Sequence, residues 1–262
     1  MVLVKGADTE IIEYLLHAER EVREVVKVTD QYPELTVADA YVLQKKLVHR
    51  KIVEGSKRVG VKLGLTSKAK QQMMGINEAI YGYLVSDMLA LEWEPVKYDQ
   101  FIHPKVEPEI AFLMGEDLQG TNITAEDVMK ATKYVTPALE VIDSRYLNFK
   151  FTLPDVIADN CSSARFILGS KWVDPMQVDL AKAGMVMSKN GEMTTVGTGA
   201  AVLGHPASAI AWAVNKLGMQ NEGLKKGDIV LSGALSEAIA FQAGDSIIAQ
   251  FDGLGSVSMF CK

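Results

Sequence analysis

Apolar residues before position 56 recur at the three- and four-residue spacing of a helix. A first group is formed by Ile11, Ile12, Leu15 and Leu16 among charged neighbours. Pro33 interrupts the pattern, and Thr36 then stands three residues before Asp39, which is the spacing of a capped helix start. Gly55 favours a helix end. The apolar stripe expected between these signals consists of Tyr41, Val42, Leu47 and Val48.

The pattern changes after Arg58 to short apolar runs between turns. The expected strands are Val59–Leu65, Val106–Met114, Pro137–Asp143, Ile229–Leu231, Ser246–Phe251 and Val257–Phe260. The expected helices are Ser67–Met74, one capped by Thr124 with Asp127, and Ala207–Leu217. We therefore predict an α+β fold in which a helical region, 1–57, is attached to a β-rich catalytic domain, 58–262.

The composition excludes several classes of protein. The chain has 262 residues, 48% of them hydrophobic, and a formal net charge of −6, which gives no electrostatic reason to bind nucleic acid or an anionic membrane. Lys5, Asp8 and Glu10 interrupt any apolar leader at the N-terminus. Cys161 and Cys261 suit neither a disulfide framework nor a metal-binding pair. We expect a cytoplasmic protein.

The segment around residue 107 offers candidate metal ligands. On a strand, Lys105, Glu107 and Glu109 share one face because side chains alternate. Two neighbouring carboxylates repel each other unless a cation lies between them, and Mg²⁺ prefers oxygen ligands. A solvated strand face with mixed charges explains the same pattern. The segment alone leaves both interpretations open.

A further acid, Glu140, interrupts a strand that otherwise looks buried. A buried carboxylate is costly unless it is paired or bound to metal, so Glu140 is either a metal ligand or an ion-pair partner, for example of Arg145. Asp143 points to the opposite face of a regular strand and is interpreted as a partner of Arg145 or as part of a turn.

Two other features have both a structural and a functional interpretation. Lys62, within an apolar strand, either extends its ammonium to solvent or acts as an acid, a base or a substrate clamp. The polar run Asp159–Ser163 either forms a turn or donates hydrogen bonds to an anion. Cys161 is rejected as a nucleophile because it has no suitable basic partner. His103 and His205, each before a proline, are interpreted as turn residues.

The order of several blocks resembles that of a known family. These blocks are Lys62–Ser67, His103–Glu109, Ala158–Ser163 and Ala200–Pro206, and the similarity runs from Val28–Pro33 to Gly253–Ser258. On these blocks, the chain resembles the 2-oxopentenoate hydratase and 4-oxalocrotonate decarboxylase family of the fumarylacetoacetate hydrolase superfamily. The resemblance implies a mixed, barrel-like β core.

The resemblance also implies the site. Its metal ligands fall on Glu107, Glu109 and Glu140, and the expected ion is Mg²⁺, with Mn²⁺ as a second possibility. The family's active-site lysine falls on Lys62, and a serine near the substrate falls on Ser163 or Ser162. Of these two serines, we assign the catalytic role to Ser163.

The branch of the family is predicted from further segments. Ile80-Tyr81-Gly82 and Val141–Phe151 look like the decarboxylase branch, because hydratases tend to carry an acid near the position of Ile80. Cys161 departs from the alanine that the family pattern leads us to expect. The implied reaction converts 2-oxo-3-hexenedioate to 2-hydroxypenta-2,4-dienoate and CO₂ in meta-cleavage degradation of aromatic compounds, through a metal-stabilised dienolate.

Three alternatives remain at this point. The first is hydration of 2-hydroxypenta-2,4-dienoate by the same metal site. The second is hydrolytic cleavage of an acylpyruvate, for which we find no histidine–carboxylate pair of clear spacing. The third is a non-catalytic partner subunit, which we rank low because all three glutamates and Lys62 are present. The resemblance further implies a homo-oligomer and association with the hydratase of the pathway.

Overall fold

The computed structural model describes residues 7–73 and 75–262. The helices are α1 Ala7–Arg20, α2 Val28–Gln31, α3 Val37–Val53, α4 Lys68–Met73, α5 Ala125–Ala131, α6 Leu153–Ala158 and α7 Pro206–Gly218. The strands are β1 Arg58–Gly64, β2 Ile80–Val85, β3 Leu89–Ala90, β4 Lys105–Met114, β5 Thr132–Ile142, β6 Ser163–Leu168, β7 Gly184–Lys189, β8 Glu192–Thr198, β9 Ile229–Leu231, β10 Ile239–Ala240, β11 Ser246–Phe251 and β12 Gly255–Phe260. Single 3₁₀ turns cover Ser86–Met88, Tyr98–Gln100, Leu147–Phe149, Asn160–Ser162, Pro175–Gln177 and Gly199–Ala201.

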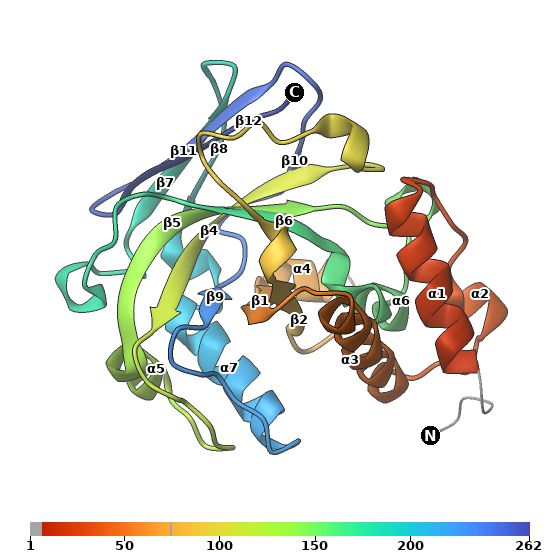
Figure 1. The fold of residues 1–262 in the computed structure, drawn as a ribbon. Helices are drawn as coiled ribbons and strands as arrows, with labels where there is room; N and C mark the ends of the chain where they lie inside the picture. Colours follow the sequence, from red (N-terminus) through yellow and green to blue (C-terminus); the bar gives the residue numbers. More distant parts are fainter. Residues whose placement is uncertain (1–6, 74) are drawn as a thin grey trace.

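The strands form two sheets (Figure 1). The larger, eight-stranded sheet has the order β2-β1-β9-β4-β5-β6-β3, with β10 paired to β4. It is mixed, because β1 pairs with β9 and β3 with β6 in parallel while its other pairs are antiparallel. The smaller sheet, β12-β11-β7-β8, packs through β11 and β12 against β5. The two sheets with separate helices confirm the predicted α+β class.

Local signals predicted several elements correctly. Thr36 and Asp39 form a reciprocal capping box at the start of α3, and Thr124 and Asp127 do the same for α5. The strand expected at Val106–Met114 is β4, which begins one residue earlier. The capping boxes depend on residues three apart in sequence, and the strand was predicted from the alternation of neighbouring residues, so the local pattern was sufficient for all three elements.

Other expectations need correction. The stripe proposed for α3 was wrong at Val42, which is 41% exposed; the buried face instead carries Ala40, Leu43, Gln44, Leu47 and Val48. The strand expected at Pro137–Asp143 begins at Thr132, and Asp143 lies beyond its end. The expected helix Ser67–Met74 is α4, and Met74 lies outside the described residues, as do residues 1–6 of the N-terminal region.

The hairpin β7–β8 was missed although the sequence marks it. Asn190 and Gly191 join the two strands with φ angles of 56° and 85°. Asn-Gly is the preferred pair for a two-residue hairpin turn with both φ angles positive. The Asn-Gly pair was therefore the sequence signal from which this hairpin could have been predicted.

Helices α1, α2, α3 and α6 gather near β2, at one end of the larger sheet, whereas α5 and α7 pack on each other away from it. α3 packs against α1, α6 and β2, and Figure 1 shows it between α1 and the β1–β2 hairpin. Helices α1 to α3 all precede Arg58, but α3 packs closely on α6 from the β-rich part, so the division into 1–57 and 58–262 stays a proposal. Among residues 7–73 and 75–262, no helix combines the length and apolarity needed to span a membrane.

Candidate metal centre and active site

Three glutamates meet on neighbouring strands of the larger sheet. The antiparallel register of β4 and β5 places Glu107 directly opposite Glu140, and Glu109 follows two residues later on the same face of β4. Each of the three offers a carboxylate oxygen, and these oxygens all lie within 4.8 Å of one another. All three side chains are buried, Glu109 and Glu140 completely. The alternative of a solvated strand face therefore does not describe this segment.

Burial with too little compensating positive charge raises the pKa of two of these acids, Glu109 and Glu140. Burial raises the pKa of Glu109 well above its usual range, and the negative charge of Glu140 raises it further, against the effect of Lys62. Burial likewise raises the pKa of Glu140 to about 6 although Lys62 lowers it. Glu109 Oε2 accepts a hydrogen bond of 2.6 Å from Gly233 N. Within the described residues, Oε1 of Glu109 and Oε1 of Glu140 have no hydrogen-bond partner.

These observations test whether a metal ion fits the three acids. Buried, mutually repelling carboxylates with unsatisfied oxygens need positive charge, and an oxygen-only donor set suits a hard divalent cation such as Mg²⁺ or Mn²⁺. Glu107, Glu109 and Glu140 therefore fit the metal that the sequence led us to expect.

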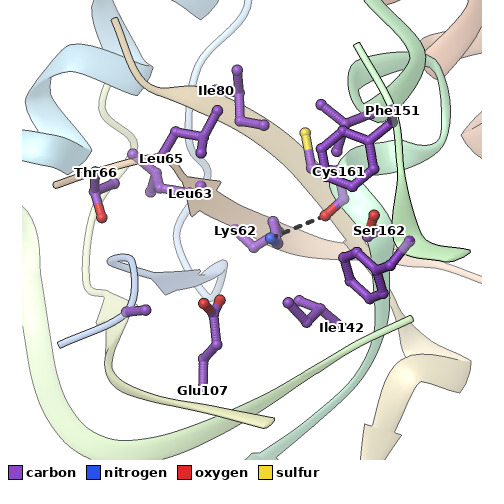
Figure 2. A pocket seen from close by; sticks show the side chains of 14 residues that line it. Lys62, Leu63, Leu65, Thr66, Ile80, Glu107, Ile142, Phe151, Cys161 and Ser162 are labelled. Carbon is purple, nitrogen blue, oxygen red and sulfur yellow. Dashed lines mark hydrogen bonds between the residues drawn. The ribbon is translucent and has the colours of Figure 1, made fainter. Parts of the chain in front are cut away.

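Lys62 extends from β1 toward the same acids. Its Nζ lies 3.0 Å from Glu140 Oε2 and donates a hydrogen bond of 3.2 Å to the carbonyl oxygen of Cys161 (Figure 2). The side chain is only 3% exposed, so the ammonium does not extend to solvent. Burial lowers the pKa of Lys62, but the negative groups around it, Glu140 foremost and then Cys161, Glu107 and Glu109, together outweigh burial and raise the net pKa, so the lysine is charged.

The acceptor of Lys62 belongs to an unusual turn. Asn160, Cys161 and Ser162 have φ angles of 46°, 55° and 56°, so three consecutive residues other than glycine are left-handed. Each such residue costs about 1–2 kcal/mol, and the conformation persists only where its surroundings impose it. We call Asn160–Ser162 the left-handed turn.

A cavity of about 560 Å³, part of it open to solvent, lies over these groups. Its polar lining includes Lys62, Glu107 and Ser162, whose side chains Figure 2 shows around one space. The Oγ of Ser162 is buried and has no hydrogen-bond partner among the described residues. The wall is otherwise mainly apolar and includes Leu63, Leu65, Ile80, Ile142, Phe149, Phe151 and Val156. The described lining of the cavity thus combines the cation of Lys62, the carboxylate of Glu107 and the unpaired hydroxyl of Ser162 with a mainly apolar wall.

The two candidate serines lie in different places. Ser162 lines the cavity, whereas Ser163 begins β6 and is not among the described lining residues. Ser163 Oγ points to Met88, 3.9 Å from its Sδ. The structure therefore brings Lys62 and the three glutamates together and adds Ser162 rather than Ser163; a catalytic role for Ser163 stays a prediction.

The remaining polar candidates have structural contacts. Arg145 donates to Oδ1 of Asp159 at 2.5 Å and to its carbonyl oxygen at 2.6 Å, so its ion-pair partner is Asp159 and not Glu140. Arg145 also donates to the carbonyl oxygen of Asp143 at 2.8 Å, so Asp143 is a partner of Arg145 through its backbone. The carboxylate of Asp143 accepts hydrogen bonds from the backbone N–H groups of Ile102 and His103. The hydrogen bonds from Arg145 therefore hold the loop that begins at Asp159.

The two candidate histidines, His103 and His205, are not among the described residues that line the cavity. The His103 ring contacts Glu24 and the carbonyl oxygen of Tyr146, each at 3.1 Å. His205 precedes α7, and its Nδ1 accepts a hydrogen bond of 3.0 Å from Ala207 N. Both therefore act as loop and cap residues, as the sequence indicated.

Sequence reasoning missed the aromatic wall. Phe149 and Phe151 line the cavity, and Phe149 reaches it through a bend in which Asn148 and Phe149 have positive φ angles of 55° and 57°. No local pattern marks this bend, because neither residue is a glycine. The block containing both phenylalanines had contributed only to the family resemblance.

Comparisons with known proteins agree with this arrangement. A model of the C-terminal part of fumarylacetoacetate hydrolase matches residues 60–259. A 4-oxalocrotonate decarboxylase of Pseudomonas putida is 44% identical over 248 residues, covering 95% of this chain and 94% of that protein. A 2-hydroxyhexa-2,4-dienoate hydratase of Comamonas testosteroni is 39% identical over 250 residues, covering 94% of each.

One solved structure is similar over the whole chain. It is 4-oxalocrotonate decarboxylase from Pseudomonas putida G7, complexed with magnesium and adipate. Its TM-score is 0.97 at 41% sequence identity, and the alignment covers 100% of this chain and 99% of that one.

Proposed function

We propose, since the chain belongs to the fumarylacetoacetate hydrolase family, that it is a metal-dependent carboxy-lyase acting on 2-oxo-3-hexenedioate. The products are 2-hydroxypenta-2,4-dienoate and CO₂, in the degradation of aromatic compounds. The observation that carries the proposal is the cavity in which Lys62 and Glu107 face an apolar wall, with Glu107 clustered with the buried Glu109 and Glu140. The likeness to 4-oxalocrotonate decarboxylases in both sequence and structure supports the choice of reaction.

The metal is assigned to the three acids. Glu107, Glu109 and Glu140 would hold Mg²⁺, the ion present in the similar decarboxylase structure, and Mn²⁺ satisfies the same donor set. When bound, the ion supplies Lewis-acid stabilisation for negative charge on the 2-oxo end of the substrate.

The reaction itself requires one bond to break. The C5–C6 bond of the substrate is cleaved, CO₂ leaves from C6, and the electron pair moves through the double bond to the C2 oxygen, which takes up one proton from solvent to give the enol product. Lys62, whose ammonium is charged and fixed by Glu140 and the Cys161 carbonyl, stabilises the developing charge by a hydrogen bond from Nζ. Ser162 Oγ, which has no partner among the described residues, is the available donor to a carboxylate oxygen.

The apolar wall determines which reaction follows. Ile80, Phe149 and Phe151 surround part of the cavity with groups that neither activate nor position water. Loss of CO₂ is favoured where the departing carboxylate is poorly solvated. Addition of water to the diene, the reaction of a hydratase, needs an ordered water and a group to activate it. The apolar Ile80 therefore favours decarboxylation over hydration.

The product of the reaction bears on which enzyme associates with this one. The product is an enol, and the relatives include a hydratase of a similar dienoate, so we propose that a hydratase associates with this enzyme to receive it. We also propose a homo-oligomeric assembly for the enzyme itself.

The decisive experiment measures CO₂. The protein is incubated with Mg²⁺ and 2-hydroxymuconate, together with the isomerase that converts the latter to 2-oxo-3-hexenedioate. We expect stoichiometric release of CO₂ that requires the protein. Conversion of 2-hydroxypenta-2,4-dienoate to 4-hydroxy-2-oxopentanoate, without CO₂ release from the diacid, would instead identify a hydratase.

A further inference from the structure

The left-handed turn covers the open edge of the larger sheet. β2 is the last strand of that sheet, so the backbone groups on its outer side have no neighbouring strand. The side-chain amide of Asn160 takes that place at Tyr83: Oδ1 accepts from Tyr83 N at 2.8 Å, and Nδ2 donates to Tyr83 O at 2.9 Å. The turn is thereby joined to the strand next to the one that carries Lys62.

A residue of the N-terminal helices completes this edge. Gln44 of α3 is fully buried, and its Nε2 donates to Tyr81 O at 2.9 Å and to Ile157 O at 3.1 Å. The same nitrogen lies 3.7 Å from Cys161 Sγ, and Cys161 Sγ in turn donates to Tyr81 O at 3.1 Å. Gln44 therefore contacts the strand, the helix that leads into the turn, and the turn itself.

The hydrogen bonds of Gln44 are not required to satisfy the backbone. Tyr81 O also accepts from Cys161, and Ile157 O also accepts from the N–H of Asp159. Within the described residues, Oε1 of Gln44 is buried without a partner, which costs free energy that an apolar side chain of similar size avoids. Fold stability alone is thus a poor explanation for a glutamine at this position.

The left-handed turn connects the contacts of Gln44 to the cavity. The carbonyl of Cys161 is the acceptor that, with Glu140, fixes Lys62, and the next residue, Ser162, presents its hydroxyl to the cavity. Because three left-handed residues are strained, loss of a neighbouring constraint allows the turn to relax and moves both groups. A displacement of about 1 Å can reduce turnover substantially, up to roughly 100-fold.

We propose that Gln44 is a positioning residue for the reaction, acting through the left-handed turn on Lys62 and Ser162. This inference rests on the function proposed above for the cavity. It assigns to the helical N-terminal region an indirect part in shaping the active site, through the left-handed turn, although none of the described cavity-lining residues comes from that region.

The test replaces Gln44 by a side chain of similar size without donors. In Gln44→Met we expect kcat to fall about tenfold, while Mg²⁺ affinity stays unchanged because the described hydrogen bonds of Gln44 go to Tyr81, Ile157 and Cys161 and not to the glutamates. The matched control is Leu16→Ala in α1, which weakens the same helical region through a buried residue of a helix that packs on α3. We expect the control to lower the unfolding temperature and keep kcat within about twofold.

A second measurement is independent of turnover. Alkylation of Cys161 by iodoacetamide, measured by peptide mass spectrometry relative to Cys261, which follows β12, reports how firmly the turn is held. We expect the relative rate to rise at least about fivefold in Gln44→Met and to stay unchanged in Leu16→Ala. Gln44→Glu, which keeps the shape but offers carboxylate oxygens to the two carbonyls, should behave like Gln44→Met.

The outcomes separate the two proposals. If the unaltered protein releases no CO₂, the proposed function fails, whatever the labelling shows. If it releases CO₂ but Gln44→Met keeps full kcat and the original labelling ratio, the role of Gln44 is wrong. If neither Gln44 variant folds, Gln44 is a stability residue and the inference is likewise overturned.

Discussion

Lys62 Nζ lies 3.0 Å from Glu140 Oε2, although β9 and β4 separate the strands that carry the two residues. Neighbouring strands are about 4.8 Å apart, so β1 and β5 would be about 14 Å apart across a flat sheet. Two long side chains on the concave face of a curved sheet can span that distance. The ion pair thus depends on the curvature of the whole sheet, and it links the proposed metal ligands to the proposed electrostatic stabiliser.

Glu107→Gln should weaken metal binding. The amide keeps the size of the side chain but removes one of three anionic ligands, so we expect Mg²⁺ affinity to fall at least about tenfold and turnover to fall with it. Calorimetric titration with Mg²⁺ measures the affinity directly. Glu126→Gln, on the exposed surface of α5, is the matched control and should bind Mg²⁺ normally. Full activity of Glu107→Gln in chelator-treated buffer would exclude Glu107 as a ligand.

Lys62→Met should reduce turnover and spare the metal. The substitution keeps the length of the buried side chain but removes its charge, and loss of such a stabilising group reduces kcat by about 100- to 1,000-fold. Mg²⁺ affinity at pH 8 should change little, because Lys62 is not a ligand in this assignment. Steady-state kinetics and metal titration on the same preparation give both values. A variant with unchanged kcat would remove Lys62 from the mechanism.

Ile80→Asp should shift the balance between the two reactions of the family. Ile80 is 4% exposed and lines the cavity, so a carboxylate there brings a polar group and water to a wall that is otherwise apolar. We expect CO₂ release to fall at least about tenfold. Ile80→Val, which preserves the apolar wall, serves as the control. Equal rates in both variants would show that water exclusion at this position does not determine the reaction.

Buried thiols should make stability fall at high pH. Burial raises the pKa of Cys161 from its usual 9.0 to about 12, against the effect of Lys62, and burial also raises the pKa of Cys261. The folded protein therefore keeps protons that the unfolded chain loses above pH 9, so the free energy of unfolding decreases as the pH rises from 9 toward 12. Urea titrations across this range should show a smaller decrease for Cys161→Ala. An identical pH dependence would contradict the assignment.

Local sequence signals predicted individual helices and strands but not how the strands come together to form the site. The capping pairs Thr36–Asp39 and Thr124–Asp127 are contained within four residues, so the sequence alone located both helices. The face shared by Glu107 and Glu109 follows from strand alternation in the same way. Whether that face was buried and which acid it met depended on the register of β4 with β5. The strand pattern left Glu140 open between a metal ligand and an ion-pair partner, and only the family resemblance assigned it to the metal.

The groups that sequence reasoning missed depend on long-range contacts or unusual backbone. Ser162 rather than Ser163 lines the cavity because the turn before β6 is left-handed, which no propensity of asparagine, cysteine and serine together predicts. Gln44 lay within a helix whose buried face was misassigned at Val42. Its partners are 37 and 113 residues away, so its contacts could not be read from its neighbours.

The covering of the β2 edge by side chains has a consequence for how the chain folds. Asn160 lies 77 residues after Tyr83, so the edge stays open until a long loop has closed. A chain that has formed its strands but not this contact exposes an unpaired strand edge, which can pair with the same edge of another molecule. The loop that completes the cavity therefore also ends a vulnerable stage of folding, and variants that loosen it should aggregate during refolding at concentrations where the unaltered protein stays monodisperse.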